Sequence, residues 1–166
     1  MLRLRPFKMS DTKYMVEWIK EERTFKMWSA DKFTFPLTVK ELEDHKALYE
    51  QDEWGRIFIA LDEKGIPVGH FLMRRADYER ESVHLGFIVV DPNQRGFGYG
   101  QEMVSLAVQY AFQMLKVKRV TLGVYDANPR AKHCYEKVGF VTETYDKDVF
   151  TYQGESWGMY NMAIER

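Results

Sequence analysis

A glycine-rich segment between a predicted strand and a predicted helix limits the fold of this chain more than any other feature. Residues 95–100 read RGFGYG, after an apolar run that ends at Val90 and before a stretch, 99–116, with apolar side chains at helical spacing. Alternate glycines let main-chain N–H groups turn inward, and the following helix adds free amides and a positive dipole end. The segment therefore predicts a cradle for a phosphate or pyrophosphate, with a tight strand-to-helix turn as the alternative.

Two other phosphate-binding loops do not fit this segment. A Walker loop ends in Gly-Lys-Ser or Gly-Lys-Thr, and the segment contains neither. A dinucleotide fingerprint needs the spacing G-x-G-x-x-G in the first strand-to-helix turn. Here the spacing is G-x-G-x-G and three predicted strands come first, so a dehydrogenase is not favoured.

The order of the predicted elements indicates one α+β domain over residues 1–166. A meander of three strands predicts antiparallel pairing, and the strand–helix–strand unit that follows predicts one parallel pair. The predicted strands are an N-terminal edge strand over 2–7, then 56–61, 67–74, 82–90, 119–125 and two strands around a turn at 153–155. The predicted helices are 11–22, 38–50, 99–116 and 129–139, and the aromatic stretch 24–36 is predicted to be a structured loop.

Composition excludes several classes of partner. Because 24 Lys and Arg face 25 Asp and Glu, the formal charge is −1, and no overall positive field attracts nucleic acid or an anionic membrane. No stretch approaches the roughly 20 apolar residues that span a bilayer. The single cysteine, Cys134, excludes an internal disulfide, and charged residues interrupt the apolar N-terminus, unlike in a signal peptide. We expect a cytoplasmic protein.

Two motifs resemble those of a known family. Arg95, Gly98 and Gly100 fill the pattern R-x-x-G-x-G, which resembles the acetyl-coenzyme A (acetyl-CoA) signature of the GNAT N-acetyltransferases. Residues 128–140, NPRAKHCYEKVGF, resemble the family segment N-x-x-A-x-x-x-Y-x-K-x-G-F. The start Leu4-Arg5-Pro6 and the aromatic loop resemble the branch with ribosomal-protein N-terminal and spermidine acetyltransferases. The resemblance covers nearly the whole chain.

This resemblance implies a fold and a way of holding acetyl-CoA. The implied fold is a mixed, mostly antiparallel sheet with a splayed parallel strand pair and helices on both faces. The pantetheine arm would lie in the splay as an added strand, and an N–H near Val89 would face the acetyl oxygen. The implied main-chain contacts are Ile88, Val89 and Val90 to pantetheine, and Arg95, Gly96, Phe97, Gly98, Tyr99, Gly100 and Gln101 to the pyrophosphate.

The resemblance also gives roles to two residues of the second motif. Tyr135 would donate a proton or hydrogen bond to the departing thiolate; a phenol titrates about 1.5 units above a thiol, so full transfer costs about 2 kcal/mol. Anchoring the helix on the core is the alternative. Asn128 would contact pantetheine, yet an Asn before a Pro is also a favourable helix N-cap.

The general base is the least defined group. Many relatives place a glutamate two residues before a glycine on the central strand, and His84 holds that position here. A histidine can act as a base near pH 7, directly or through water, although a lone strand histidine is more often only hydrogen-bonded. The four histidines show no metal-ligand spacing, so we predict no metal site.

We therefore expect an enzyme that moves the acetyl group of acetyl-CoA to a primary amine by direct transfer in a ternary complex. A catalytically inactive CoA-binding sensor or interaction module of the same fold is the alternative. The acceptor would be a small-molecule amine or a peptide N-terminus, and aromatic residues in 25–35 and 152–157 could line its pocket or belong to the core. Acidic side chains in that pocket would favour a second positive charge on the amine. The late strands could pair across two copies as a homodimer.

Overall fold

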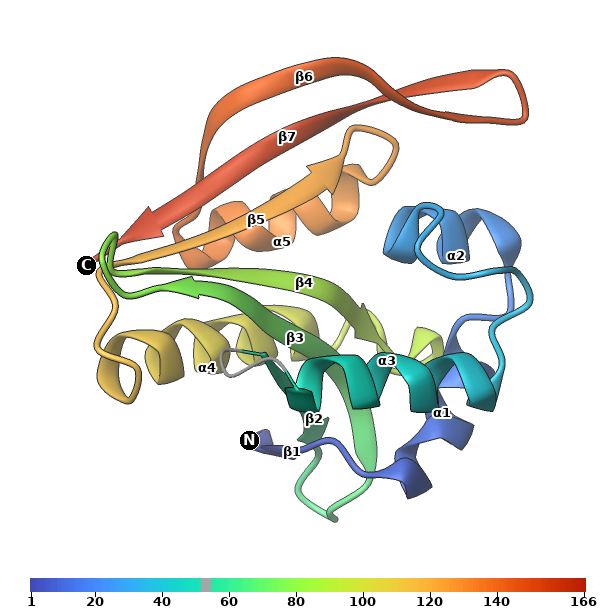
Figure 1. The fold of residues 1–166 in the computed structure, drawn as a ribbon, viewed down its shortest axis with the longest axis horizontal. Helices are drawn as coiled ribbons and strands as arrows, with labels where there is room; N and C mark the ends of the chain where they lie inside the picture. The colour runs from blue at the N-terminus through green and yellow to red at the C-terminus, as the bar shows by residue number, and fades with distance from the viewer. Residues whose placement is uncertain (52–54) are drawn as a thin grey trace.

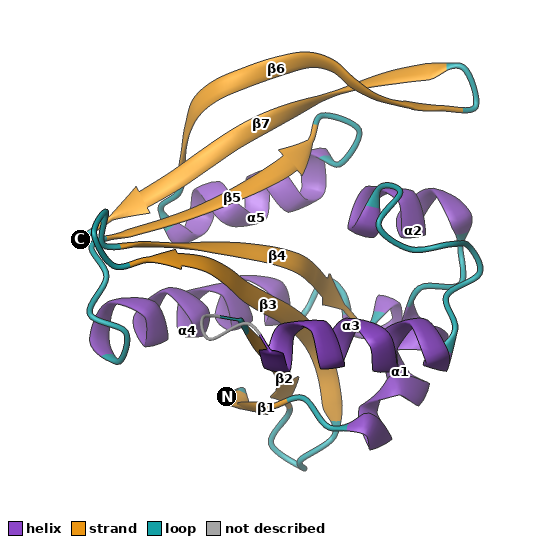
Figure 2. Ribbon diagram, in the orientation of Figure 1, coloured by secondary structure: helices purple, strands orange, loops and turns teal. Residues whose placement is uncertain are grey.

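A seven-stranded sheet crosses the residues that this computed structural model describes, 1–51 and 55–166 (Figures 1 and 2). The strands lie in the order β1-β2-β3-β4-β5-β7-β6, and neighbours are antiparallel except β4 and β5, which are parallel. The bounds are β1 Arg3–Pro6, β2 Arg56–Leu61, β3 Pro67–Asp77, β4 Ser82–Val90, β5 Arg119–Tyr125, β6 Val141–Tyr152 and β7 Glu155–Glu165. The predicted edge strand, meander, parallel pair and α+β class are confirmed.

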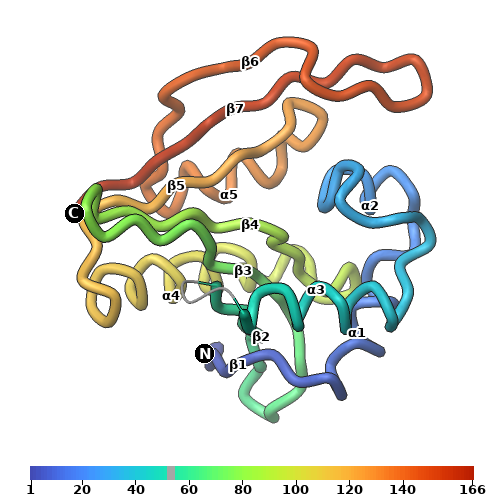
Figure 3. Tube along the Cα trace, viewed as in Figure 1, coloured from blue at the N-terminus to red at the C-terminus, as the bar shows by residue number. Residues whose placement is uncertain are grey.

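Helices cover both faces of this sheet. Along β2, Phe58 and Ala60 join the apolar cluster beneath α4 and α5, whereas Ile57 and Ile59 join the cluster beneath α1, α2 and α3. The helices are α1 Thr12–Trp18, α2 Glu22–Ser29, α3 Val39–Gln51, α4 Tyr99–Gln113 and α5 Pro129–Val138, with 3-10 turns at Met9–Asp11 and Pro92–Gln94. None of the helices described is long and apolar enough to cross a membrane. The late strands β6 and β7 form a long hairpin beside β5 (Figure 3).

Helix ends follow the predicted capping residues. The hydroxyl of Thr38 accepts a hydrogen bond from the N–H of Glu41 at 3.3 Å, and the Glu41 carboxylate accepts one from the N–H of Thr38 at 3.3 Å. This capping box starts α3. At α5 the side chain of Asn128 accepts from the N–H of Ala131, and Gly139, with a φ of 115°, ends the helix.

The N-terminal region contains a helix that sequence reasoning missed. The prediction of a loop over 24–36 is wrong for its first part, because α2 extends to Ser29. The carboxylate of Glu21 accepts two main-chain N–H groups of the first turn and caps the helix. Glutamate is not a usual N-cap and the helix is short, so the sequence carried little signal. The helix predicted over 11–22 ends at Trp18.

A β-bulge interrupts β4 opposite β3. The Cα partner of Gly86 is Leu72 and that of Val89 is His70, so β4 holds one extra residue in this interval. Phe87 lies in the bulge with a φ of 50°. Its carbonyl accepts a 2.9 Å hydrogen bond from Nδ1 of His70, whose side chain is buried. His70 therefore fixes the position of the bulge.

The parallel strands β4 and β5 separate after a short ladder. Three residue pairs join them at the end near the C-terminus of the chain, the last being His84 with Thr121. Figure 1 shows the two strands diverging beyond that point, with α2 opposite the opening. The predicted splay is confirmed. Its consequence is that main-chain groups of β4 beyond His84 have no partners from β5 among the described residues.

The bulge contact predicts a pH effect on stability. Burial lowers the pKa of His70 to about 4, whereas an unfolded histidine titrates near about 6.5. Between these values only the unfolded state binds the proton, so lowering the pH from 6.5 to 4 should cost about 3 kcal/mol through this residue. His70→Asn keeps a donor near Nδ1 and should flatten the pH slope of the unfolding free energy, measured by urea denaturation.

A matched control separates this effect from general acid sensitivity. His133→Asn changes an exposed histidine and should leave the slope unchanged. The slope that remains in His70→Asn comes from His45 and His84, whose pKa values burial also lowers to about 4, and, toward pH 4, from carboxylates with lowered pKa values such as Asp11 and Glu143. Equal slopes in the wild type and His70→Asn would show that His70 is not the buried neutral histidine described.

Candidate functional site

A cavity of about 690 Å³ lies where β4 and β5 separate. Its wall also includes the glycine-rich loop, α5, β7 and the end of α2. The predicted site residues that line it are His84, Ile88, Val89, Val90, Arg95, Gly96, Gly98, Tyr99, Gly100, Gln101, Asn128 and Tyr135. Phe97, although described, is not part of the wall, and 72% of its surface is exposed. The structure thus brings together residues from both predicted motifs.

The glycine-rich loop leaves open space above its main chain. Gly96 and Gly98 have φ values of 90° and 82°, which residues other than glycine rarely adopt. A Cβ built on either would have no described atom within 4 Å. Gly98 is also the N-cap of α4, so the free amides of the helix start lie beside this space. These features fit a bound phosphate or pyrophosphate.

Two arginines flank the loop without acidic partners. Among the described residues, neither Arg95 nor Arg130 forms an ion pair, and both line the cavity. Burial, followed by the nearby Arg130 guanidinium, lowers the pKa of Arg95, and the more weakly acting carboxylates of Asp91 and Glu21 only partly oppose this shift. Two unpaired positive charges at close range repel each other, and a doubly charged anion between them would remove that repulsion.

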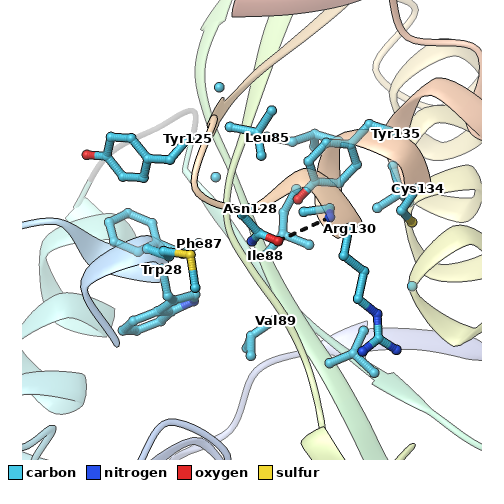
Figure 4. Close-up of a pocket in the computed structure, with 18 of the residues that line it drawn as sticks. Trp28, Leu85, Phe87, Ile88, Val89, Tyr125, Asn128, Arg130, Cys134 and Tyr135 are labelled. Atoms are coloured by element: carbon cyan, nitrogen blue, oxygen red, sulfur yellow. Dashed lines mark hydrogen bonds between the residues drawn. The ribbon is translucent and has the colours of Figure 1, made fainter. Parts of the chain in front are cut away.

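Tyr135 projects from α5 into the cavity. Its side chain is buried, and Figure 4 shows the hydroxyl directed toward Ile88. No described residue hydrogen-bonds to this hydroxyl. Burial raises the pKa of Tyr135 above the ordinary value for a phenol. The group therefore keeps its proton at neutral pH and is available as a hydrogen-bond donor within the cavity.

Asn128 combines a structural bond with a place in the wall. Its Oδ1 accepts the N–H of Ala131 at 3.2 Å, drawn as a dashed line in Figure 4. The same residue also lines the cavity. The capping alternative is confirmed, and the Asn128 amide N–H₂ group has no hydrogen-bond partner among the described residues.

His84 lies at the closed end of the splay. Its Nδ1 is 2.9 Å from Oγ1 of Thr121, across the last pair of the β4–β5 ladder. Burial, with smaller effects of Arg74 and Arg75, lowers the pKa of His84 to about 4. The ring is therefore neutral at pH 7, and it is a weaker base than an exposed histidine.

The predicted aromatic stretches divide between the core and the cavity wall. Phe25 and Phe33 belong to the core, and Trp157 is buried against other aromatic rings. Trp28 does line the cavity, together with residues that sequence reasoning missed: Lys32, Arg74, Arg75, Met159 and Asn161. Their positions depend on strand register and on the path of the loop after α2, which no local pattern reveals. None of the described lining residues is an aspartate or glutamate.

Comparison with known proteins identifies the family. A model of the acetyltransferase (GNAT) family matches residues 14–140. The chain belongs to this family. The resemblance drawn from the two motifs is confirmed, and the protein is an acetyl-CoA-dependent N-acyltransferase.

Individual relatives agree with this assignment. Spermidine N(1)-acetyltransferase of Vibrio cholerae is 24% identical over 163 residues, covering 98% of this chain and 92% of the relative. A prophage-derived N-acetyltransferase of Bacillus subtilis is 28% identical over 142 residues, covering 81% and 78%. The solved V. cholerae spermidine N-acetyltransferase in complex with CoA and spermine has the same fold, with a TM-score of 0.86, 24% identity, and coverage of 99% of this chain and 95% of that one.

The loop geometry predicts a selective effect of one methyl group. Gly98→Ala places a side chain at positive φ, which should cost about 1 kcal/mol of stability, and puts a Cβ in the open space above the amides. We expect the Kd for CoA, measured by isothermal titration calorimetry, to rise about tenfold or more, which corresponds to 1.4 kcal/mol.

Gly154 supplies a matched control. It also has a positive φ, 81°, with no described atom within 4 Å of a Cβ, but it lies in the turn between β6 and β7. Gly154→Ala should lose similar stability and keep the wild-type Kd. Equal CoA affinity in Gly98→Ala and Gly154→Ala would contradict a phosphate site at the loop.

Proposed function

We propose that this enzyme transfers the acetyl group directly from acetyl-CoA to the primary amine of a small molecule. One observation supports this above the others: a single cavity borders the glycine-rich loop, the free edge of β4 and Arg74 on the opposite face of the sheet. When bound, acetyl-CoA supplies an activated acetyl thioester. Two substrates can meet in one such space, which is what direct transfer requires.

The binding residues follow from the open backbone. Main-chain groups of Ile88, Val89 and Val90 would hold the pantetheine arm as an added strand, because β5 leaves that edge of β4 unpaired. The amides of residues 95–101, with Arg95 and Arg130, would hold the pyrophosphate. An N–H near Val89 would stabilise negative charge on the acetyl oxygen. The amide of Asn128 would add a polar contact to pantetheine.

Tyr135 would donate its hydroxyl proton toward the departing sulfur. Support comes from its buried phenol, which remains protonated and has no partner among the described residues. The raised pKa makes complete proton transfer less favourable than for an exposed tyrosine, so hydrogen bonding in the transition state is the larger part of the role.

The chemistry of Cys134 favours direct transfer over an acetylated enzyme. Its thiol lines the cavity, and burial raises its pKa. A thiol of raised pKa forms little thiolate at neutral pH and is a poor nucleophile. Initial-rate plots against both substrates should therefore intersect; parallel lines would indicate a two-step route through an acetylated residue.

His84 would help to remove the amine proton. A neutral ring at pH 7 can accept a hydrogen bond at the nitrogen that Thr121 does not occupy. Since a pKa of about 4 makes it a weak base, we assign it the orientation of a water molecule that carries the proton to solvent.

Acetylation assays distinguish the proposed enzyme from an inactive CoA-binding module and from an enzyme that acts on peptide N-termini. CoA-dependent stabilisation without thiol release on any amine would favour the module. Acetylation of peptide N-termini in preference to small amines would make a peptide the acceptor.

A homodimer is supported by β6, an exposed edge strand that carries the exposed side chains of Val141, Tyr145 and Val149. Sedimentation would test it.

The central catalytic prediction concerns Tyr135. Tyr135→Phe removes one hydroxyl and keeps the ring contact with Phe140. Turnover should fall by well over about tenfold because the departing sulfur loses its donor, whereas the Kd for CoA and the melting temperature should stay close to wild type. Thiol release with a saturating amine measures turnover.

Tyr110→Phe is the matched control. Tyr110 is a half-buried tyrosine of α4 that contacts Phe58 and is not in the described cavity wall. This variant should retain wild-type turnover. An unchanged rate in Tyr135→Phe would remove Tyr135 from the mechanism.

A further inference from the structure

Arg74 lies on the side of the cavity that belongs to the sheet face beneath α1, α2 and α3. We call this side the acceptor side, and the side with the glycine-rich loop the cofactor side. Side chains alternate along β3, and Leu72, two residues earlier, packs in the cluster beneath α1, α2 and α3. Arg74 follows it on that face, with its guanidinium 5.4 Å from the ring centre of Phe87. The glycine-rich loop and α4 belong to the opposite side of the sheet.

The cofactor and acceptor sides contain separate sets of charges. Figure 4 shows Trp28 and Phe87 across the cavity from Arg130, Cys134 and Tyr135. Arg95 and Arg130 flank the glycine-rich loop on the cofactor side. On the acceptor side, Lys32 and Arg74 add positive charge that no described lining carboxylate balances.

Hydrogen-bond donors on this side lack partners. Nε of Arg74 and Nε1 of Trp28 are both buried, and neither has a hydrogen-bond partner among the described residues. Both side chains contact the Phe87 ring: the Arg74 guanidinium lies 5.4 Å from the ring centre, and the indole of Trp28 packs edge-on against it at 5.4 Å. Buried N–H groups without acceptors are costly, so a ligand that supplies acceptor oxygens there would be stabilised.

The charge of Arg74 is also unbalanced. No described carboxylate pairs with it, and no described lining residue is acidic. Its field contributes, after burial, to the lowered pKa values of both His45 and His84. A substrate that carries a second ammonium group would meet repulsion at this end of the cavity, whereas an anion would be attracted.

We infer that the acceptor is a small amine that also carries a carboxylate, and that Arg74 and the indole N–H of Trp28 bind this carboxylate. The inference rests on the acetyl transfer proposed above for the same cavity. Arginine is suited to the task because its planar fork of N–H donors matches the two oxygens of a carboxylate. The substrate class therefore differs from the spermidine for which the Vibrio relative is named.

The test compares acceptors of equal length and different charge. The ω-amino acids from glycine to 6-aminohexanoate are assayed beside their primary amides and the diamines of the same chain length, with spermidine added. Each set keeps the reacting amine and changes only the distant group. We expect kcat/KM for the best amino acid to exceed that of its amide and its diamine by about tenfold or more, as for a charged hydrogen bond.

Variants assign this preference to the proposed residue. Arg74→Gln should lower the ratio of kcat/KM for the best amino acid to kcat/KM for its amide about tenfold to a hundredfold, a ratio in which any effect on the shared chemical step cancels. Arg74→Lys should retain part of the preference, because it keeps the charge and loses the fork. Arg80→Gln is the control, since Arg80 is an exposed arginine near Asp77 and is not in the described wall.

Two kinetic outcomes would overturn the inference while leaving acetyl transfer intact. The first is that the wild type acetylates diamines or spermidine best. The second is that Arg74→Gln lowers kcat/KM for all acceptors alike. Failure of the proposed function looks different, because no amine would then release thiol. In that case calorimetry with the CoA-loaded protein decides the inference: binding of an amino acid of the series that is lost in Arg74→Gln supports it, and absence of binding overturns it.

Discussion

The separation of β4 from β5 beyond His84 and Thr121 is the constraint on which the site depends. Main-chain N–H and C=O groups in a sheet are normally paired, and here β5 turns away from one edge of β4. The bulge at Phe87, held by the buried His70, sets the direction of that edge. A ligand with amides of its own can complete such an edge, and the pantetheine of acetyl-CoA is one.

Local signals in the chain were sufficient for the reaction class. The R-x-x-G-x-G loop has positive φ at Gly96 and Gly98, and a helix starts directly after it. Its structural requirements therefore lie in contiguous residues. The same holds for Asn128 and Gly139, which begin and end α5. These positions could be predicted because the physical requirement lies within a few residues of each one.

Features that depend on distant contacts could not be predicted in this way. The bulge arises because β4 has one residue more than β3 between their flanking residue pairs. The hydrogen bond that holds it comes from His70, 17 positions before Phe87. Helix α2 begins at an unusual glutamate cap. Arg74 resembles any arginine near the end of a strand until the register places it over Phe87 without a carboxylate. The family motifs identify the donor substrate, whereas the acceptor that we infer rests on contacts such as that of Arg74 with Phe87.

Amide hydrogen exchange tests the open edge most directly. In the free protein the splay predicts fast exchange for the amides of residues 87–90 that face the open edge of β4 and for those of the loop 96–100, and slow exchange over 82–84, where β5 pairs with β4. Amides of 87–90 that face β3 are already paired and should exchange slowly with or without CoA. Saturating CoA should slow exchange at the open edge and in the loop and leave 82–84 unchanged. Open-edge amides of 87–90 that are already slow in the free protein, or that CoA does not alter, would contradict a pantetheine site between the strands.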